Sequence, residues 1–254
     1  MSRIFITGSS DGLGLMTGRL LSEQGHKVVL HARNTARAQD ARHALPGADV
    51  VIGDVSTIAG ARSVAEQANA HGRFDAVIHN VAIGYREPRR IETGDRLPQV
   101  FATNVLAPCI LTVQMMRPER LIYLSSALHR STTARLDDVF WRKRSWDGTA
   151  AYSETKLYDV MLAFAIARRW PDVFSNALEP GWVPTKMGGA DAPDDIYQAH
   201  LTQVWLAAGD DARVTGQYFY HRQRLAPNPQ AEDTDLQDRL ISVCEKSTQL
   251  ALPK

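Results

Sequence analysis

The sequence has 254 residues with 29 basic and 28 acidic side chains, so its formal net charge is +1 at pH 7, and 44% of its residues are hydrophobic. This balance is typical of a globular protein and gives no general electrostatic reason to bind nucleic acid. No apolar run is long enough to span a membrane, and no secretory signal precedes the first strand-like run, so we expect a cytoplasmic protein. The two cysteines, Cys109 and Cys244, are too few for a disulfide framework or a zinc site, so we expect no metal centre.

Short apolar runs alternate with longer helical patterns along most of the chain, which predicts parallel strands joined by crossover helices. Because several of the strand-like runs are apolar without strict alternation, both faces of the sheet should be covered. The fold class is therefore α/β, with a doubly wound parallel sheet of about seven strands in one domain over residues 1–254. The expected strands are 3–7, 27–32, 50–53, 75–80, 120–125, 173–178 and 216–220. The expected helices are 13–24, 36–44, 58–70 and 98–116, with an amphipathic helix at about 233–250 that closes the chain on the sheet's edge.

A glycine-rich turn directly follows the first strand and precedes the first helix. Residues 7–14 read TGSSDGLG, which places Gly8, Gly12 and Gly14 where the pyrophosphate of a dinucleotide needs close access to backbone N–H groups and a helix N-terminus. An ordinary strand-to-helix turn could carry the same glycines. The position after a first strand favours the dinucleotide site.

The end of the second strand indicates which dinucleotide is bound. An NAD site usually presents an acidic residue there to the ribose 2′-hydroxyl. This chain has Arg33, and no carboxylate occurs between Glu23 and Asp40. Arginine suits a ribose 2′-phosphate through charge-assisted hydrogen bonds, which favours NADP(H), although a solvated residue at a strand end is the alternative. Asp54, just after the third strand, could reach the adenine amino group or, equally with Ser56, cap the next helix.

Tyr152 and Lys156 are one turn apart at the start of a helical pattern, so they share one face of that helix. A tyrosine with its ordinary pKa of about 10 exchanges protons poorly at neutral pH unless a nearby ammonium favours the phenolate. Lys156 supplies such an ammonium, which indicates an acid/base pair. A surface tyrosine and lysine on an amphipathic helix are the alternative.

In chain order, the glycine turn, Asn80, Asn104, Ser126 and the Tyr152-x-x-x-Lys156 pair resemble the short-chain dehydrogenase/reductase family over essentially the whole chain. The resemblance implies a Rossmann-type sheet, a nicotinamide cofactor and an active site acting on carbonyls or alcohols. It makes Tyr152 the acid/base and Ser126 the holder of the substrate oxygen. It also implies that Lys156 lowers the pKa of Tyr152 and binds the nicotinamide ribose, and that Asn104 supports a water leading protons to Lys156.

The same resemblance implies a larger set of cofactor contacts, in which the Pro-Gly-Trp-Val-Pro-Thr loop after the sixth strand meets the nicotinamide carboxamide. The expected cofactor-binding residues are Gly8, Ser10, Asp11, Gly12, Leu13, Gly14, Arg33, Asp54, Val55, Asn80, Ala82, Tyr152, Lys156, Pro180, Gly181, Val183 and Thr185.

The chain departs from the family pattern at two places. The family often has Asn-Asn-Ala-Gly where this chain has His-Asn-Val-Ala at 79–82, so Ala82 puts a methyl group beside the adenosine. The insert between Ser126 and Tyr152 is longer than in compact members. Together with the segments 125–129 and 180–185, this insert resembles the retinol-dehydrogenase-like branch.

The sequence therefore predicts NADP(H)-dependent hydride transfer between an apolar or aromatic carbonyl compound and its alcohol. Trp141, Trp146, Trp182 and Met187 are candidates for an apolar substrate pocket, with core packing as the alternative, and His129 could enter that pocket or be hydrated. A non-catalytic NADP(H)-binding sensor or scaffold is a second hypothesis, and a sugar-nucleotide epimerase is a third. The expected partner is a small-molecule substrate, not a nucleic acid or a membrane. The sequence leaves the oligomeric state open, and the family resemblance implies that a second copy could pair through the helix at 151–170.

Overall fold

The computed structural model describes residues 1–252, which form one eight-stranded sheet in the order β3-β2-β1-β4-β5-β6-β7-β8. The strands from β1 to β7 run parallel, and only β8 pairs antiparallel with its neighbour. This arrangement confirms the predicted α/β class and the doubly wound, Rossmann-type sheet. The strands are β1 (Arg3–Ile6), β2 (Lys27–Ala32), β3 (Asp49–Ile52), β4 (Ala76–His79), β5 (Arg120–Leu124), β6 (Phe174–Glu179), β7 (Tyr218–Tyr220) and β8 (Gln223–Leu225).

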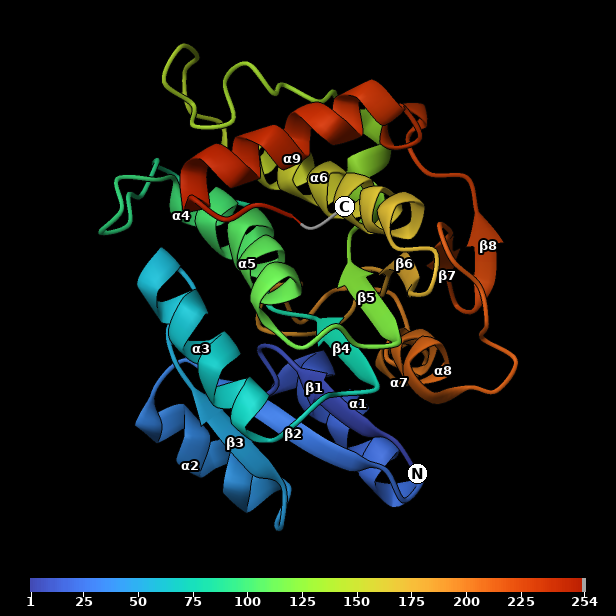
Figure 1. Cartoon of the computed structure of the whole chain (residues 1–254). Coiled ribbons are helices and arrows are strands. Elements are labelled where there is room, and N and C mark those ends of the chain that lie inside the picture. Colours follow the sequence, from blue (N-terminus) through green and yellow to red (C-terminus); the bar gives the residue numbers. More distant parts are fainter. Residues whose placement is uncertain (253–254) are drawn as a thin grey trace.

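Helices cover both faces of the sheet (Figure 1). On one face, α3, α5, α6 and α9 enclose a large core that includes Phe5, Val77 and Leu121 from the strands. On the other face, α1, α2 and α8 enclose a second core around Ile4 and Ile78. The helices are α1 (Gly12–Glu23), α2 (Thr35–Ala44), α3 (Ile58–Ala70), α4 (Gln99–Phe101), α5 (Ala107–Gln114), α6 (Gly148–Arg169), α7 (Ile196–Ala199), α8 (Leu201–Ala208) and α9 (Thr234–Thr248), with short helical turns η1 (Ala102–Leu106), η2 (Ala127–Ser131) and η3 (Pro229–Ala231).

In the second half of the chain, three elements were not predicted and one prediction was wrong. β8 was missed because it has only three residues and follows a turn in which His221 and Arg222 take positive φ without the glycine or asparagine that usually signals it. The helices α7 and α8 were not predicted at all. The closing helix α9 was predicted to pack on the edge of the sheet. It packs instead on the outside of α6, on the face of the sheet that α3, α5 and α6 cover.

The long helix α6 carries Tyr152 and Lys156, and it is buried at every residue from 151 to 166. It packs on β5 and β6, and α9 covers it from outside. Met161 and Phe164 are therefore core residues, and this helix has no free face over 151–166 for pairing with a second copy. Among residues 1–252, none of the helices combines the length and apolarity needed to cross a bilayer.

Candidate active site

A cavity of about 440 Å³ opens at the carboxyl ends of β5 and β6, next to the glycine turn that joins β1 to α1. Ligand sites of parallel α/β sheets form at this edge, so the cavity is the candidate active site. Its lining is mainly apolar and includes the phenol of Tyr152 and the hydroxyl of Ser126. The lining residues are Leu13, Tyr85, Arg86, Ser125, Ser126, Ala127, Leu128, Tyr152, Pro180, Gly181, Trp182, Val183, Thr185, Met187 and Gly188.

Tyr152 and Lys156 lie on a buried face of α6, whose N-terminus is capped by the carboxylate of Asp147. Tyr152 is 7% exposed and Lys156 is 2% exposed, and the ammonium nitrogen of Lys156 is 5.6 Å from the centre of the Tyr152 ring. Lys156 Nζ donates to the carbonyl of Leu124 and to a carboxylate oxygen of Asp159, both at 2.8 Å. The predicted tyrosine and lysine do face each other, and the buried carboxylate of Asp159 is an addition that the sequence did not predict.

Burial and charge act in opposite directions on these three groups. Burial raises the pKa of Tyr152, whereas the Lys156 ammonium and hydrogen bonding with Ser126 lower it. Burial lowers the pKa of Lys156, but the charge and hydrogen bond of Asp159 together with Tyr152 outweigh burial and raise it. Burial also raises the pKa of Asp159, against the attraction of Lys156. Lys156 thus acts on Tyr152 in the predicted direction, but burial is the larger effect and leaves the pKa of Tyr152 above its usual value.

The two serines that follow β5 both line the cavity, but their hydroxyls have different hydrogen-bond partners. Ser126 lines the cavity, and its hydroxyl oxygen accepts a hydrogen bond from the backbone N–H of Leu128 at 3.4 Å. Ser125 is 4% exposed, and its hydroxyl donates to the backbone carbonyl of Lys156 at 2.7 Å. Ser125 therefore joins β5 to α6, which leaves Ser126 as the hydroxyl that is free to meet a substrate.

Asn104 lies in η1, a π-helical turn between α4 and α5. Its side chain accepts from the backbone N–H of Ile83 at 2.9 Å, and it donates to the carbonyl of Ile83 and to Thr155 Oγ1, both at 3.0 Å. The side chain thus joins the loop after β4 to α6. Its role in supporting a water stays a prediction.

The glycine turn is held in place by neighbouring strands. Gly8 has φ +60, and a Cβ there would lie 2.9 Å from the Cα of Val81. A Cβ on Gly14 would lie 2.5 Å from the amide nitrogen of Asn80, which donates to the carbonyls of Thr7 and Gly8. Gly8 and Gly14 are therefore required for the turn to pack against the loop after β4, whereas a Cβ on Gly12 would meet no atom within 4 Å. A glycine turn held in this way at a helix N-terminus suits a dinucleotide phosphate.

The two arginines near the end of β2 differ in their partners. Arg33 is exposed at this edge of the sheet. Arg37 pairs with Asp11 of the glycine turn, which also accepts from Lys186 Nζ at 2.6 Å. Burial raises the pKa of Asp11, but its hydrogen bonds with Lys186 and Arg37 outweigh burial and lower it. The Asp11 carboxylate therefore joins Arg37 of α2 to Lys186 of the loop after β6. Of the two arginines, Arg33 is the one that has no acidic partner within residues 1–252 and could meet a ribose phosphate.

The remaining predicted cofactor residues lie along the same edge. Ser10, Val55 and Ala82 follow β1, β3 and β4, and residues 180–185 wall the cavity after β6. Asp54 does not cap α3, because Thr57 does so; the Asp54 carboxylate accepts from the backbone N–H of Ser56 at 2.9 Å. Both capping alternatives for Asp54 and Ser56 were therefore wrong.

The aromatic candidates divide into two groups. Trp182 and Met187 line the cavity and are 51% and 39% exposed. Trp141 and Trp146 are outside the lining and pack edge to face, with ring centres 5.3 Å apart, in a cluster that includes Tyr152. The pocket prediction was thus wrong for these two tryptophans.

His129 neither enters the cavity nor meets water. It is fully buried, its Nδ1 lies 2.7 Å from the carbonyl of Ser126, and its Nε2 accepts from the backbone N–H of Asn228 at 3.2 Å. Burial lowers the pKa of His129 to about 4. The neutral ring therefore supports the turn that carries Ser126.

Comparison with known proteins assigns the family. A family model described as short chain dehydrogenase matches residues 2–125. A protein of Gibberella zeae named as a short-chain dehydrogenase is 41% identical, and the alignment covers 100% of this chain and 99% of that protein. The chain belongs to the short-chain dehydrogenase family.

More distant proteins are similar to this chain in sequence or in fold. Human retinol dehydrogenase 13 is 26% identical over 98% of this dehydrogenase and 85% of the relative. An uncharacterized protein of Mycobacterium paratuberculosis has the same fold, with a TM-score of 0.84 at 23% identity over 100% of this chain and 96% of that one. A carbonyl reductase from chicken fatty liver, solved with NADPH bound, gives a TM-score of 0.69 at 20% identity over 89% of this chain and 99% of that one.

Several residues that shape the site of this dehydrogenase were not predicted. Asp159 is three residues after Lys156, a spacing that places it on the same helical face. Tyr85 and Arg86 come from an irregular loop whose sequence carries no periodicity. Asp194 accepts from the backbone N–H of Trp182 at 2.6 Å and so fixes the loop after β6. Only Asp159 had a signal in the sequence that could have identified it.

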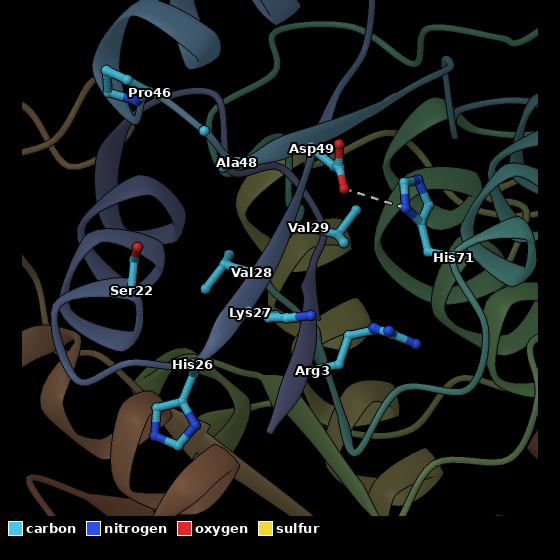
Figure 2. A pocket seen from close by; sticks show the side chains of 11 residues that line it. Arg3, Ser22, His26, Lys27, Val28, Val29, Pro46, Ala48, Asp49 and His71 are labelled. Atoms are coloured by element: carbon cyan, nitrogen blue, oxygen red, sulfur yellow. Dashed lines mark ion pairs between the residues drawn. The ribbon is translucent and has the colours of Figure 1, made fainter. Parts of the chain in front are cut away.

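A second cavity of about 430 Å³ lies at the opposite edge of the dehydrogenase, where β1, β2 and β3 begin (Figure 2). Arg3 and Lys27 enter it from the first residues of β1 and β2. The carboxylate of Asp49 lies 3.5 Å from Nδ1 of His71. Of the residues that the structure describes, none predicted to take part in catalysis or cofactor binding lines this second cavity.

Proposed function

We propose that this short-chain dehydrogenase interconverts an apolar or aromatic carbonyl compound and its alcohol, with NADP(H) as the cofactor. The observation that supports this most directly is the position of Tyr152 in an apolar cavity with the Lys156 ammonium behind its ring. A phenol beside a buried ammonium can give or take a proton without a metal ion.

The nucleotide site is consistent with NADP(H). Gly8 and Gly14 let the turn pack against Val81 and Asn80, the Asn80 amide donates to the carbonyls of Thr7 and Gly8, and the space beside Gly12 is open. Arg33 stands exposed where a ribose 2′-phosphate would lie, and no acidic residue occupies that strand end. Support also comes from the chicken carbonyl reductase, which has NADPH bound in its crystal structure.

The residues of the site divide the chemistry between them. The bound nicotinamide supplies or accepts the hydride. In reduction, Tyr152 donates its phenolic proton to the substrate oxygen, and Ser126 holds that oxygen with a hydrogen bond as negative charge develops on it. Lys156 keeps a positive charge beside Tyr152 and holds the ribose. We retain for Asn104 the predicted role of supporting a water on the proton path to Lys156.

The shape of the site favours an apolar substrate. Trp182, Met187 and Leu128 contribute apolar surface to the same cavity as Tyr152. The exposed surfaces of Trp182 and Met187 lie where a bound molecule would cover them. We propose further that residues 1–254 act as one cytoplasmic domain, whose partner at this site is a small carbonyl or alcohol.

Calorimetric titration with NADPH and NADH, followed by a panel of aldehydes and ketones monitored at the nicotinamide absorbance, tests this function. The enzyme should bind NADPH more tightly than NADH and oxidise NADPH with at least one apolar carbonyl compound. Tight NADPH binding without turnover on the whole panel would instead identify a non-catalytic sensor. Failure to bind either nucleotide would overturn both hypotheses.

A further inference from the structure

We propose that Arg86 forms an anion subsite at the active-site cavity, so that the preferred substrates are aromatic or apolar carbonyl compounds that also carry a carboxylate or similar anion. This inference rests on the proposed function and adds the charge of the substrate to it. Arg86 would determine which substrates are preferred, because its guanidinium would bind the anionic group and leave the carbonyl to react at Tyr152.

Among the described residues, Arg86 is the one charged side chain in the lining of the 440 Å³ cavity. Within residues 1–252 no carboxylate lies within salt-bridge distance of its guanidinium, whereas Arg90 of the same loop pairs with Glu92, and Arg144 pairs with Asp138 and Glu154. Arg86 is exposed at present, and a substrate in the cavity would cover it and exclude water. An unpaired cation beside an apolar wall suits a ligand that is apolar with an anionic end.

The ring of Tyr85 contacts both this cation and the ring of Tyr152. The guanidinium carbon of Arg86 is 4.9 Å from the centre of the Tyr85 ring, and that ring is 5.6 Å from the ring of Tyr152. The guanidinium carbon is therefore at most about 10.5 Å from the centre of the Tyr152 ring, a distance that an aromatic substrate with a hydrogen bond at each end can span. Such a molecule can offer its carbonyl to Tyr152 and its anionic group to Arg86 at the same time.

The backbone next to Arg86 is fixed to the start of the catalytic helix. The indole N–H of Trp146 donates to the carbonyl of Glu87 at 2.8 Å, and Gly148, the first residue of α6, approaches the backbone of Glu87 so closely that a Cβ could not fit there. Tyr85 takes φ +76, a conformation that is costly for a residue with a side chain. The loop therefore holds an unfavourable backbone conformation while it presents Arg86 at a fixed place relative to α6.

The test compares two ketones that differ in charge and share the same reacting group, para-acetylbenzoate and its methyl ester. The wild-type enzyme, the Arg86→Gln variant and the Arg89→Ala variant are assayed with each ketone and NADPH. Arg89 is a matched control because it is an exposed arginine of the same loop that is outside the cavity lining. We expect the wild-type enzyme to prefer the acid, and Arg86→Gln to reduce the ratio of kcat/KM for acid to ester by about tenfold or more. Arg89→Ala should leave the ratio within about twofold of wild type.

A binding measurement separates this subsite from catalysis. Calorimetric titration of the Tyr152→Phe variant with para-acetylbenzoate should show binding that weakens by about tenfold when Arg86→Gln is added. The proposal is wrong if the wild-type enzyme prefers the ester, if the ratio is unchanged in Arg86→Gln, or if acid binding is independent of Arg86. In each of these cases NADPH-dependent reduction of the ester or of another neutral ketone would still stand, so the two proposals fail separately.

Discussion

Two cavities of nearly equal volume, about 440 and 430 Å³, lie at opposite edges of the same sheet. At the carboxyl edge, the buried phenol of Tyr152 and the ammonium of Lys156 are set against an apolar wall. At the amino edge, the charged groups are exposed or already paired, as in the contact between Asp49 and His71 (Figure 2). Volume alone does not distinguish the two cavities, whereas the buried titratable pair favours the carboxyl edge as the candidate catalytic site.

The largest effect is expected when the phenolic oxygen at the carboxyl edge is removed. Tyr152→Phe should lower kcat by about 1,000-fold, because the general acid is lost, while the NADPH dissociation constant stays within about twofold. Stopped-flow or steady-state oxidation of NADPH measures the first quantity and calorimetry the second. Tyr85→Phe is the matched control, since it removes a phenol from the ring that packs 5.6 Å away. Turnover retained in Tyr152→Phe would exclude the assigned acid.

A second change tests whether the carboxyl edge distinguishes the two dinucleotides. Arg33→Ala should weaken NADPH binding by about tenfold or more, because charge-assisted hydrogen bonds to the 2′-phosphate are lost. NADH binding should not change. Arg42→Ala, another exposed arginine on the neighbouring α2, serves as the control. Equal losses for NADPH and NADH in Arg33→Ala would show that Arg33 does not read the phosphate.

The buried carboxylate of Asp159 provides a pH test of the same edge. Its negative charge raises the pKa of both Tyr152 and Lys156. Asp159→Asn removes that charge, so the tyrosine–lysine pair should lose its first proton at a lower pH. The pH profile of kcat/KM for alcohol oxidation, which needs the deprotonated phenol, should therefore shift toward acid, with roughly a tenfold change at the pH of steepest slope. An unshifted profile in a folded Asp159→Asn protein would contradict this coupling.

The smallest effect is expected at the amino edge. Lys27→Ala removes an exposed cation from the second cavity. The kcat/KM for NADPH-dependent reduction should stay within about twofold, and the free energy of unfolding should change by less than about 0.5 kcal/mol. A large loss of activity would show that the two edges are coupled. Urea unfolding distinguishes such coupling from simple destabilisation.

The sequence predicted those features of the fold and site that depend on local spacing. The glycines of the turn at residues 7–14 are only a few residues apart, so a single turn sets their geometry. Tyr152 and Lys156 are also close in sequence, so a single helix sets theirs. The burial of Asp159 could not be predicted, because an acid at this spacing is usually on a solvated face and only the packing around α6 removes it from water.

Other features depend on contacts between distant parts of the chain. His129 is buried because Asn228 bonds to it from 99 residues away. The place of Arg86 depends on Trp146 and Gly148 fixing the neighbouring Glu87. The β7–β8 hairpin turns at His221 and Arg222, which lack the usual turn signal. No local pattern predicts these features, since each is decided by tertiary contacts or by an unusual backbone conformation.

The buried ring of His31 makes the glycine turn sensitive to acid. Its Nδ1 accepts a hydrogen bond from the backbone N–H of Gly8 at 3.0 Å, so its Nε2 carries the proton toward the carbonyl of Gly53 at 2.9 Å, and only this tautomer fits. Burial lowers the pKa of His31, which keeps the ring neutral in ordinary conditions. An imidazolium there would place two N–H groups against each other and release Gly8 from β2. Acidification would therefore loosen the phosphate-binding backbone itself, independently of Tyr152.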